Sequence, residues 1–194
     1  MRTSKKERTT KETSIKTEIN IDGNGQYKIE TDLKFFKHML EQFAAHSDFD
    51  ITIEAKSLDG DSHHLVEDTA ITLGEAISEA LGDKKGIKRY GTQFLPMDEA
   101  LVRCVLDLSG RAFCKVNVPL KDEKTSDFET VLLAHFFRSL SQSLKAAIHI
   151  DMLDGEDTHH IIEAVFKAFA RALAQAVSID EKNQNKIMST KGVL

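Results

Sequence analysis

The sequence predicts an α+β protein made of two similar halves, each a small sheet with helices packed on it. Three observations predict this class: runs with a helical period, short alternating runs with the period of a strand, and a histidine-rich block that occurs twice. The chain has 194 residues with two prolines and no low-complexity linker. We therefore expect one domain, residues 1–194, built from two pseudo-repeats at about 8–95 and 96–194 that pack together.

The predicted elements follow the same order in both halves: strands, helix, strand, helix. Alternating apolar residues predict the strands, and apolar residues spaced three and four apart predict the helices. In the first half we expect strands at 13–21 and 26–31 joined as a hairpin, a helix at 33–46, a strand at 49–55 and a helix from the first histidine pair to Leu81. In the second half we expect strands at 101–108 and 112–118, a helix at 128–144, a strand at 146–151 and a helix from the second histidine pair to Val177. The other segments are predicted to be a solvated tail at 1–11, a connector at 86–91 and a charged loop at 122–127.

Composition and charge argue against several classes of protein. The net charge of -5 argues against a general nucleic-acid binder. No apolar run reaches the length of a membrane span and the N-terminus lacks a secretory apolar core, so we expect a cytoplasmic protein. The two cysteines, Cys104 and Cys114, lie on predicted strands. A bridge between them is conceivable, but we expect two reduced, buried thiols.

A block of the form His-His-x-x-Glu opens two of the predicted helices. The two copies are His63-His64-Leu65-Val66-Glu67 and His159-His160-Ile161-Ile162-Glu163. On a helix, each glutamate lies one turn after its histidines. Adjacent imidazoles point about 100° apart, so the two members of a pair reach two different ions more easily than one ion.

The duplication extends upstream of each block. His38 precedes His63 by 25 residues, and His135 precedes His159 by 24. Similarity at a fixed spacing indicates a duplicated supersecondary unit. A single histidine pair is most often a core or surface feature, but two copies with a matched glutamate and a matched upstream histidine predict a metal centre.

The types of ligand limit which metal ions are suitable and indicate whether the ions are structural or catalytic. Imidazoles and carboxylates without thiolates suit manganese first, then iron, zinc or cobalt, and argue against a purely structural zinc. Two octahedral ions with four protein ligands each keep open positions, which implies catalysis on a bound substrate. The ions either lie close together as a pair or bracket a substrate that has two donor atoms.

Several cations lie outside the ligand set. They are Arg89, Arg111, Lys167 and Lys191. Each alone is most often a solvated surface charge, but together beside a metal centre they favour an anionic substrate, with phosphate as the commonest such group. Lys167 lies one helical turn beyond Glu163 and is predicted to project from the same face.

From about Arg8 to Leu194 the chain resembles the imidazoleglycerol-phosphate dehydratase family. The resemblance rests on Thr10-Lys11-Glu12-Thr13, His38-Met39-Leu40, His63-His64 with Glu67-Asp68, Gly86-Ile87 with Arg89, Asp98-Glu99-Ala100, Leu108-Ser109-Gly110-Arg111, His135-Phe136-Phe137, His159-His160-Ile161-Ile162-Glu163-Ala164 and Ser189-Thr190-Lys191-Gly192. It implies a carbon–oxygen hydro-lyase of histidine biosynthesis that converts D-erythro-imidazole-glycerol phosphate into imidazole-acetol phosphate. It also implies a fold similar to a duplicated ribosomal protein S5 domain 2, and trimers that assemble into a 24-mer with active sites at subunit contacts.

The resemblance also implies roles for individual residues. Two Mn²⁺ ions per active site are held by His38, His63, His64, Glu67, His135, His159, His160 and Glu163. The substrate and its phosphate are bound by Glu12, Gln42, His46, Arg89, Arg111, Lys167, Ser189, Thr190 and Lys191. The residues expected to take part in catalysis are Glu12, His38, His64, Glu67, His160 and Glu163.

The chemistry that follows is reasonable for these groups. The C–H bond to be broken is not acidic, but an imidazole on a metal can lose its N–H proton and form a stabilised imidazolate. Electrons from the ring then expel the neighbouring hydroxyl, and Glu12 is the candidate base for the carbon proton. Two other functions use similar residues: a di-metal phosphate-ester hydrolase, which would release inorganic phosphate, and a non-catalytic metal-binding or storage shell.

Overall fold

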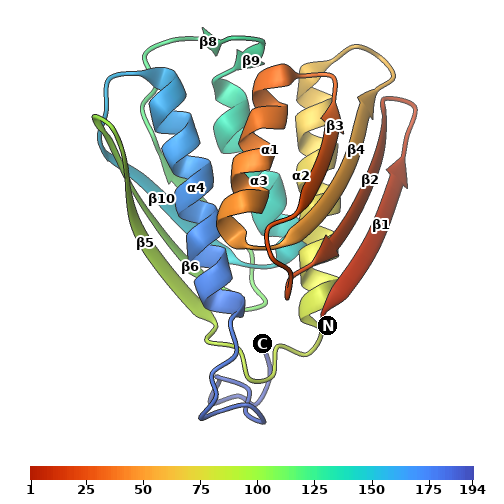
Figure 1. The fold of residues 1–194 in the computed structure, drawn as a ribbon, viewed down its shortest axis with the longest axis vertical. Coiled ribbons are helices and arrows are strands. Elements are labelled where there is room, and N and C mark those ends of the chain that lie inside the picture. Colours follow the sequence, from red (N-terminus) through yellow and green to blue (C-terminus); the bar gives the residue numbers. More distant parts are fainter.

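The computed structural model describes residues 1–194 and contains two four-stranded sheets, four long helices and a small hairpin (Figure 1). The first half contains β1 (Thr3–Thr9), β2 (Thr13–Asn20), β3 (Tyr27–Thr31), α1 (Lys34–Ser47), β4 (Asp50–Ser57) and α2 (Ser62–Leu81). The second half contains β5 (Tyr90–Met97), β6 (Ala100–Asp107), β7 (Phe113–Asn117), β8 (Lys124–Thr125), β9 (Phe128–Glu129), α3 (Val131–Leu144), β10 (Ala147–Asp154) and α4 (Thr158–Val177).

The two halves have the same topology. The strand orders are β1-β2-β4-β3 and β5-β6-β10-β7, and in each sheet the last strand is parallel to its neighbour while the other pairs are antiparallel. In each half a helix connects this last strand to the strand beside it, and a second helix follows. The prediction of an α+β fold with two similar sheet-plus-helix halves is confirmed.

The helices lie between the two sheets, so each sheet has one covered and one solvated face (Figure 1). Along β2, Ile15 and Ile19 are buried whereas Lys16 and Glu18 are exposed, which is the alternation expected of a half-buried strand. Aromatic rings join the halves: the rings of Phe43 and Phe169 stack with centroids 5.8 Å apart. The core is therefore continuous across both halves.

Two predictions about the strands of the first half were wrong. Residues 1–11 are not a solvated tail, because β1 pairs along its length with β2. Charged inward side chains of β1 form ion pairs with carboxylates of α2, where a typical strand would bury apolar side chains. Arg8 Nε lies 2.7 Å from Asp68 Oδ1, and Lys6 Nζ lies 2.9 Å from Glu79 Oε2. The strand at 26–31 is not a hairpin partner of the preceding strand. As β3 it pairs with β4 in parallel, and β4 separates it from β2.

The strand β5 was absent from the prediction, which placed a connector at 86–91 and a repeat boundary near residue 95. Apolar side chains on both faces hide its alternation, and Gly91 occupies an inward position where a Cβ would overlap the backbone oxygen of Ala172. β5 pairs with β6, so the predicted boundary falls inside a strand of the second half. The charged loop at 122–127 also contains part of the hairpin β8–β9, which delays the start of α3 from Phe128 to Val131.

The two cysteines are free, as expected, but only Cys104 is buried, and Cys114 is half-buried. Cys104 on β6 lies opposite Ile150, and Cys114 on β7 lies opposite Ile148, so β10 separates the two thiols. Two strand spacings amount to about 9–10 Å, which exceeds the reach of a disulfide. No helix in residues 1–194 combines the length and apolar character that a bilayer-spanning segment requires.

Candidate metal centre

Both histidine pairs lie in the first turn of a long helix. Asp61 and Asp157 are the N-caps of α2 and α4, and their carboxylates accept backbone N–H groups of His63 and His159, both at 2.7 Å. These caps fix the rotation of each helix start and therefore the direction of the imidazoles.

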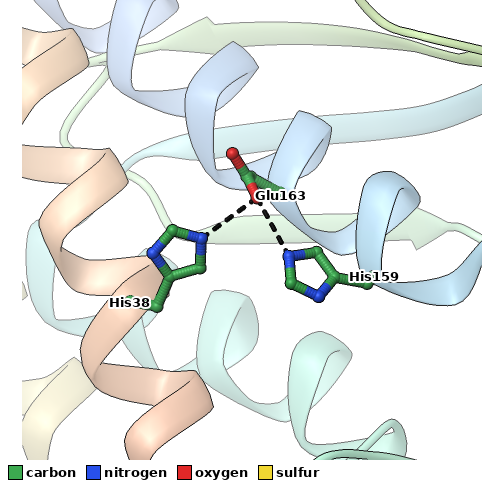
Figure 2. A group of neighbouring side chains, drawn as sticks. All are labelled: His38, His159 and Glu163. Atoms are coloured by element: carbon green, nitrogen blue, oxygen red, sulfur yellow. Dashed lines mark hydrogen bonds and ion pairs between the residues drawn. The ribbon is translucent and has the colours of Figure 1, made fainter.

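The first group of potential ligands combines both halves of the chain. Nε2 of His38, on α1, and Nε2 of His159, on α4, each lie 3.1 Å from Oε2 of Glu163 (Figure 2). The three side chains point toward one another between the two helices, and their donor atoms meet the spacing that one ion requires. The upstream histidine of the first half thus joins the histidine block of the second half.

The second group repeats this arrangement with the halves exchanged. His135, on α3, stacks on His63, on α2, with ring centroids 4.1 Å apart, and its Nε2 lies 3.6 Å from Oε1 of Glu67. His135 Nε2 is buried and has no hydrogen-bond partner. A buried nitrogen without a partner is costly in a protein interior, and imidazole and carboxylate donors are the ligands that a borderline divalent cation prefers. The residues of both groups therefore fit a divalent metal ion.

His64 and His160, the second members of the pairs, point away from both groups. Nδ1 of His64 lies 2.8 Å from Asp59 Oδ2 and 3.8 Å from Glu12 Oε2. Nδ1 of His160 lies 2.9 Å from Glu99 Oε2. In both histidines the carboxylate at Nδ1 leaves Nε2 as the atom available to an ion. The hydrogen bonds that the imidazoles donate to these carboxylates also raise the pKa values of both histidines.

Glu163 is the most buried of the acidic candidates. Burial on its own raises the pKa of its carboxyl, but the hydrogen bond from Lys167 and those from His38 and His159 outweigh burial, and the pKa is lowered. Lys167 Nζ lies 2.6 Å from Glu163 Oε1. Glu163 is therefore held as a carboxylate, the form that binds a cation.

The residues expected to bind phosphate fall into two places. Arg89 and the C-terminal segment lie together, since Arg89 Nη1 donates to the carbonyl oxygen of Met188 at 2.5 Å. Arg111 follows Gly110, where an added Cβ would overlap the backbone carbonyl carbon of Leu194. The expected residues Ser189, Thr190 and Lys191 lie in that same segment.

The second place is on the helices. Gln42 and His46 lie on α1, and Lys167 lies on α4. The pKa of His46 is lowered, first by burial and then by the positive charges of Lys167 and Arg171. The backbone N–H of Arg89 donates to the oxygen of Ala176 at the C-terminal end of α4, whereas His159 is at its start. A helix of 20 residues spans about 30 Å, so one chain does not bring Arg89 to the metal groups.

Three carboxylates near the histidines were not assigned a role from the sequence: Asp59, Asp98 and Glu99. Asp59 and Glu99 each hold one imidazole, and Asp98 Oδ2 lies 3.9 Å from Nε2 of His160. Asp98 and Glu99 lie in the β5–β6 turn, which is equivalent to the β1–β2 turn that holds Glu12, and this equivalence could have identified them. Asp59 lies in the loop before α2.

Comparison with known proteins agrees with this geometry. A family model described as imidazoleglycerol-phosphate dehydratase matches residues 31–173. A curated imidazoleglycerol-phosphate dehydratase from Ruegeria pomeroyi is 52% identical over 195 residues, with 100% of each chain covered. One from a Thermoanaerobacter species is 49% identical over 195 residues, with the same 100% coverage.

Solved structures give the same result. The crystal structure of imidazoleglycerol-phosphate dehydratase from Staphylococcus aureus superposes with a TM-score of 0.83 at 40% identity, covering 92% of this chain and 99% of that one. The structure of IGPD from Pyrococcus furiosus in complex with (S)-C348 superposes with a TM-score of 0.85 at 40% identity, covering 97% and 100%. The chain therefore belongs to the imidazoleglycerol-phosphate dehydratase family, the carbon–oxygen hydro-lyases that dehydrate imidazoleglycerol phosphate in histidine biosynthesis.

Proposed function

We propose that this enzyme acts in the cytoplasm and dehydrates imidazoleglycerol phosphate with the help of two divalent cations. Manganese is the first candidate for both ions. The observation that carries the proposal is the pair of matched groups, His38 with His159 and Glu163, and His63 with Glu67 and His135. Each group supplies three donors from two different helices. Two sites of the same construction in one chain fit two ions of the same kind.

A further ligand to each ion would come from a neighbouring chain. His64 and His160 form their hydrogen bonds through Nδ1 and point out of their own chain's groups, so their Nε2 atoms are suited to a metal in another copy. The phosphate-binding residues near Arg89 lie about 30 Å from the start of α4, which again requires a second chain to complete the site. These features support active sites at subunit contacts, and the family resemblance implies that the subunits form trimers that assemble into a 24-mer.

The residues of this chain divide the work of the reaction. Divalent ions held by the two histidine–glutamate groups would supply the positive charge that lowers the pKa of the substrate's imidazole N–H. Glu163 and Glu67 lie beside histidines, where a carboxylate balances the charge of a cation. Arg89 and Arg111 supply the planar, permanently charged donors that bind phosphate oxygens. Glu12 lies 3.8 Å from His64 on an exposed turn, where its carboxylate would be placed to take the carbon proton of a substrate bound beside that histidine.

The products separate this function from its competitors. Purified enzyme given manganese and imidazoleglycerol phosphate should form the enol or ketone product without releasing inorganic phosphate. Release of phosphate would identify a hydrolase. If Arg111→Ala and Lys191→Ala left substrate binding and turnover intact, those two cations would have no part in phosphate binding, and a storage shell would be favoured.

Glu12→Gln tests the assignment of the base. It should retain metal and substrate binding but lower turnover by about 100-fold or more, since a positioned general base contributes that much. Glu7→Gln, on the exposed face of the neighbouring strand β1, is the matched control and should keep full turnover. Unchanged turnover in Glu12→Gln would remove this residue from the proton transfer.

A further inference from the structure

Lys84 is a buried lysine that the reaction described above does not use. Only 6% of the residue is exposed, and its Nζ donates to the carbonyl oxygen of Leu108 at 3.2 Å. We propose that the ammonium group of Lys84 positions Arg89 and Arg111 for phosphate binding. This role rests on the phosphate site proposed above and adds a residue that does not itself touch the substrate.

The cost of burying Lys84 indicates a role beyond packing. An ammonium group has three donors, and that of Lys84 donates to one acceptor, the carbonyl oxygen of Leu108. Burial lowers the pKa of Lys84, because the charged form is the one that loses water. Apolar residues often replace buried charges without loss of stability, so a core position under stability selection alone would not need a lysine. Lys84 also adopts a left-handed backbone conformation, with φ 59°, which is unfavourable for a residue with a Cβ.

The segment between α2 and β5, which carries Lys84 and Arg89, holds Leu108 at both its backbone N–H and its carbonyl. The N–H of Leu108 donates to the backbone oxygen of Arg89 at 3.1 Å, and its carbonyl accepts from Lys84. Leu108 is the last residue before the Ser109-Gly110-Arg111 turn, whose geometry is set by Gly110 at φ 76° and by the N–H of Arg111, which donates to Ser109 Oγ at 3.3 Å. Fixing Leu108 therefore fixes where the Arg111 side chain begins.

The charges around Lys84 link it to the other arginine. Arg89 donates to both carboxylate oxygens of Asp107, at 2.7 and 3.0 Å, and only 12% of its side chain is exposed. Asp107 is near enough to Lys84 to favour the charged lysine, whereas Lys145 and Arg89 oppose it. One carboxylate is thus shared among several cations, and this end of the molecule keeps an excess of positive charge for a phosphate group.

The test is a comparison of Lys84→Met with Lys85→Met, measured in the metal-loaded enzyme. Methionine keeps most of the length of the buried side chain but removes the charge and the donor. Lys85 is adjacent, exposed and paired only with Asp83 at 3.5 Å, so it is a matched control for charge. The probes are imidazoleglycerol phosphate, inorganic phosphate as an inhibitor, and the same imidazole glycerol without its phosphate.

Lys84→Met should raise the KM for the phosphorylated substrate and the inhibition constant of inorganic phosphate by about tenfold, the scale of one charge-assisted contact. Binding of the unphosphorylated compound, manganese stoichiometry and kcat should change by less than about threefold, since a lost contact made equally in ground and transition states affects KM alone. Lys84→Arg keeps the charge and a donor, so it should retain phosphate affinity. If Lys84 only filled space in the core, Lys84→Met would retain that affinity as well.

The outcomes separate this inference from the function on which it rests. If Arg111→Ala weakens phosphate binding while Lys84→Met does not, the positioning role is wrong and the phosphate site stands. If neither variant changes the affinity for inorganic phosphate, the phosphate site itself is wrong. Should Lys84→Met fail to fold, Lys84→Gln, which is too short to reach Leu108 but remains polar, carries the same comparison. An equal loss of phosphorylated and unphosphorylated ligand in that variant would overturn the proposal.

Discussion

Nδ1 of His160 lies 2.9 Å from Oε2 of Glu99, although 61 residues separate the two in the sequence. The other oxygen of Glu99 accepts the N–H of Asp157, the N-cap of α4, at 2.9 Å. These hydrogen bonds, the one from Asp157 first, lower the pKa of Glu99 to about 2. Glu99 is therefore a permanent carboxylate that ties the β5–β6 turn to the start of α4 and fixes which imidazole nitrogen faces outward. Asp59 does the same for His64 at 2.8 Å.

Removal of Glu99 should weaken metal binding without removing a ligand. Glu99→Ala should lower manganese affinity by about 10- to 100-fold, the usual effect of losing a carboxylate that orients a ligating histidine. Electron paramagnetic resonance or calorimetric titration of the purified protein measures the affinity. Glu156→Ala is the matched control, because this exposed neighbour contributes no side-chain contact to an imidazole. Equal affinities in the two variants would show that Glu99 has no part in the metal site.

A second prediction concerns the start of α1, which has no capping side chain of its own. Asp127, from the β8–β9 turn, accepts the N–H groups of Lys34 and Phe35 at 2.7 and 2.9 Å. Asp127→Ala should lower the free energy of unfolding by about 1 kcal/mol, the typical value of an N-cap. Chemical denaturation of the metal-free protein measures it, and Glu129→Ala, exposed in the same hairpin, should have no effect.

The same contact should depend on pH in one direction. Burial raises the pKa of Asp127, but the hydrogen bonds from Phe35 and Lys34 outweigh it, so the folded pKa is below its ordinary value. A lowered folded pKa means that the stabilisation is complete above the unfolded pKa of about 3.9 and is lost as pH falls through the folded pKa. The difference in stability between wild type and Asp127→Ala should therefore be constant from pH 5 to 7 and shrink below about pH 4. A difference that grew on acidification would contradict the assignment.

The two cysteines should be inert in the folded protein. Burial raises the pKa of both thiols, that of Cys114 to about 11, and only the thiolate reacts with alkylating reagents. Mass spectrometry after iodoacetamide treatment at neutral pH should show no modification of native protein and two modified sites after denaturation. Rapid native modification, or a disulfide under non-reducing conditions, would contradict the packing of β6, β10 and β7.

The sequence was sufficient for the parts of the site that depend on local geometry. Helix periodicity placed Glu67 beside His63 and separated the members of each histidine pair, because these relationships span only one turn. The crossing of His38 to α4 and of His135 to α2 depends on how α1 packs on α4 and α3 on α2, which no local pattern encodes.

The strands that escaped prediction have a similar explanation. β1 carries charged residues that pair with α2 in place of an apolar stripe, and β5 is apolar on both faces. Both strands are stabilised by contacts with other elements and lack the alternation of apolar and polar residues on which a prediction of strands relies. The role of Glu99 was hidden for the same reason, since its partners lie near residue 160.

The most direct test of the central claim is to measure metal content and particle size of the purified enzyme before and after chelation, with turnover assayed on the same samples. We predict about two manganese ions per chain, a large particle that chelation converts into small assemblies without activity, and recovery of both size and turnover when manganese is restored. A small particle that binds no metal and keeps full turnover in the presence of chelator would contradict the claim.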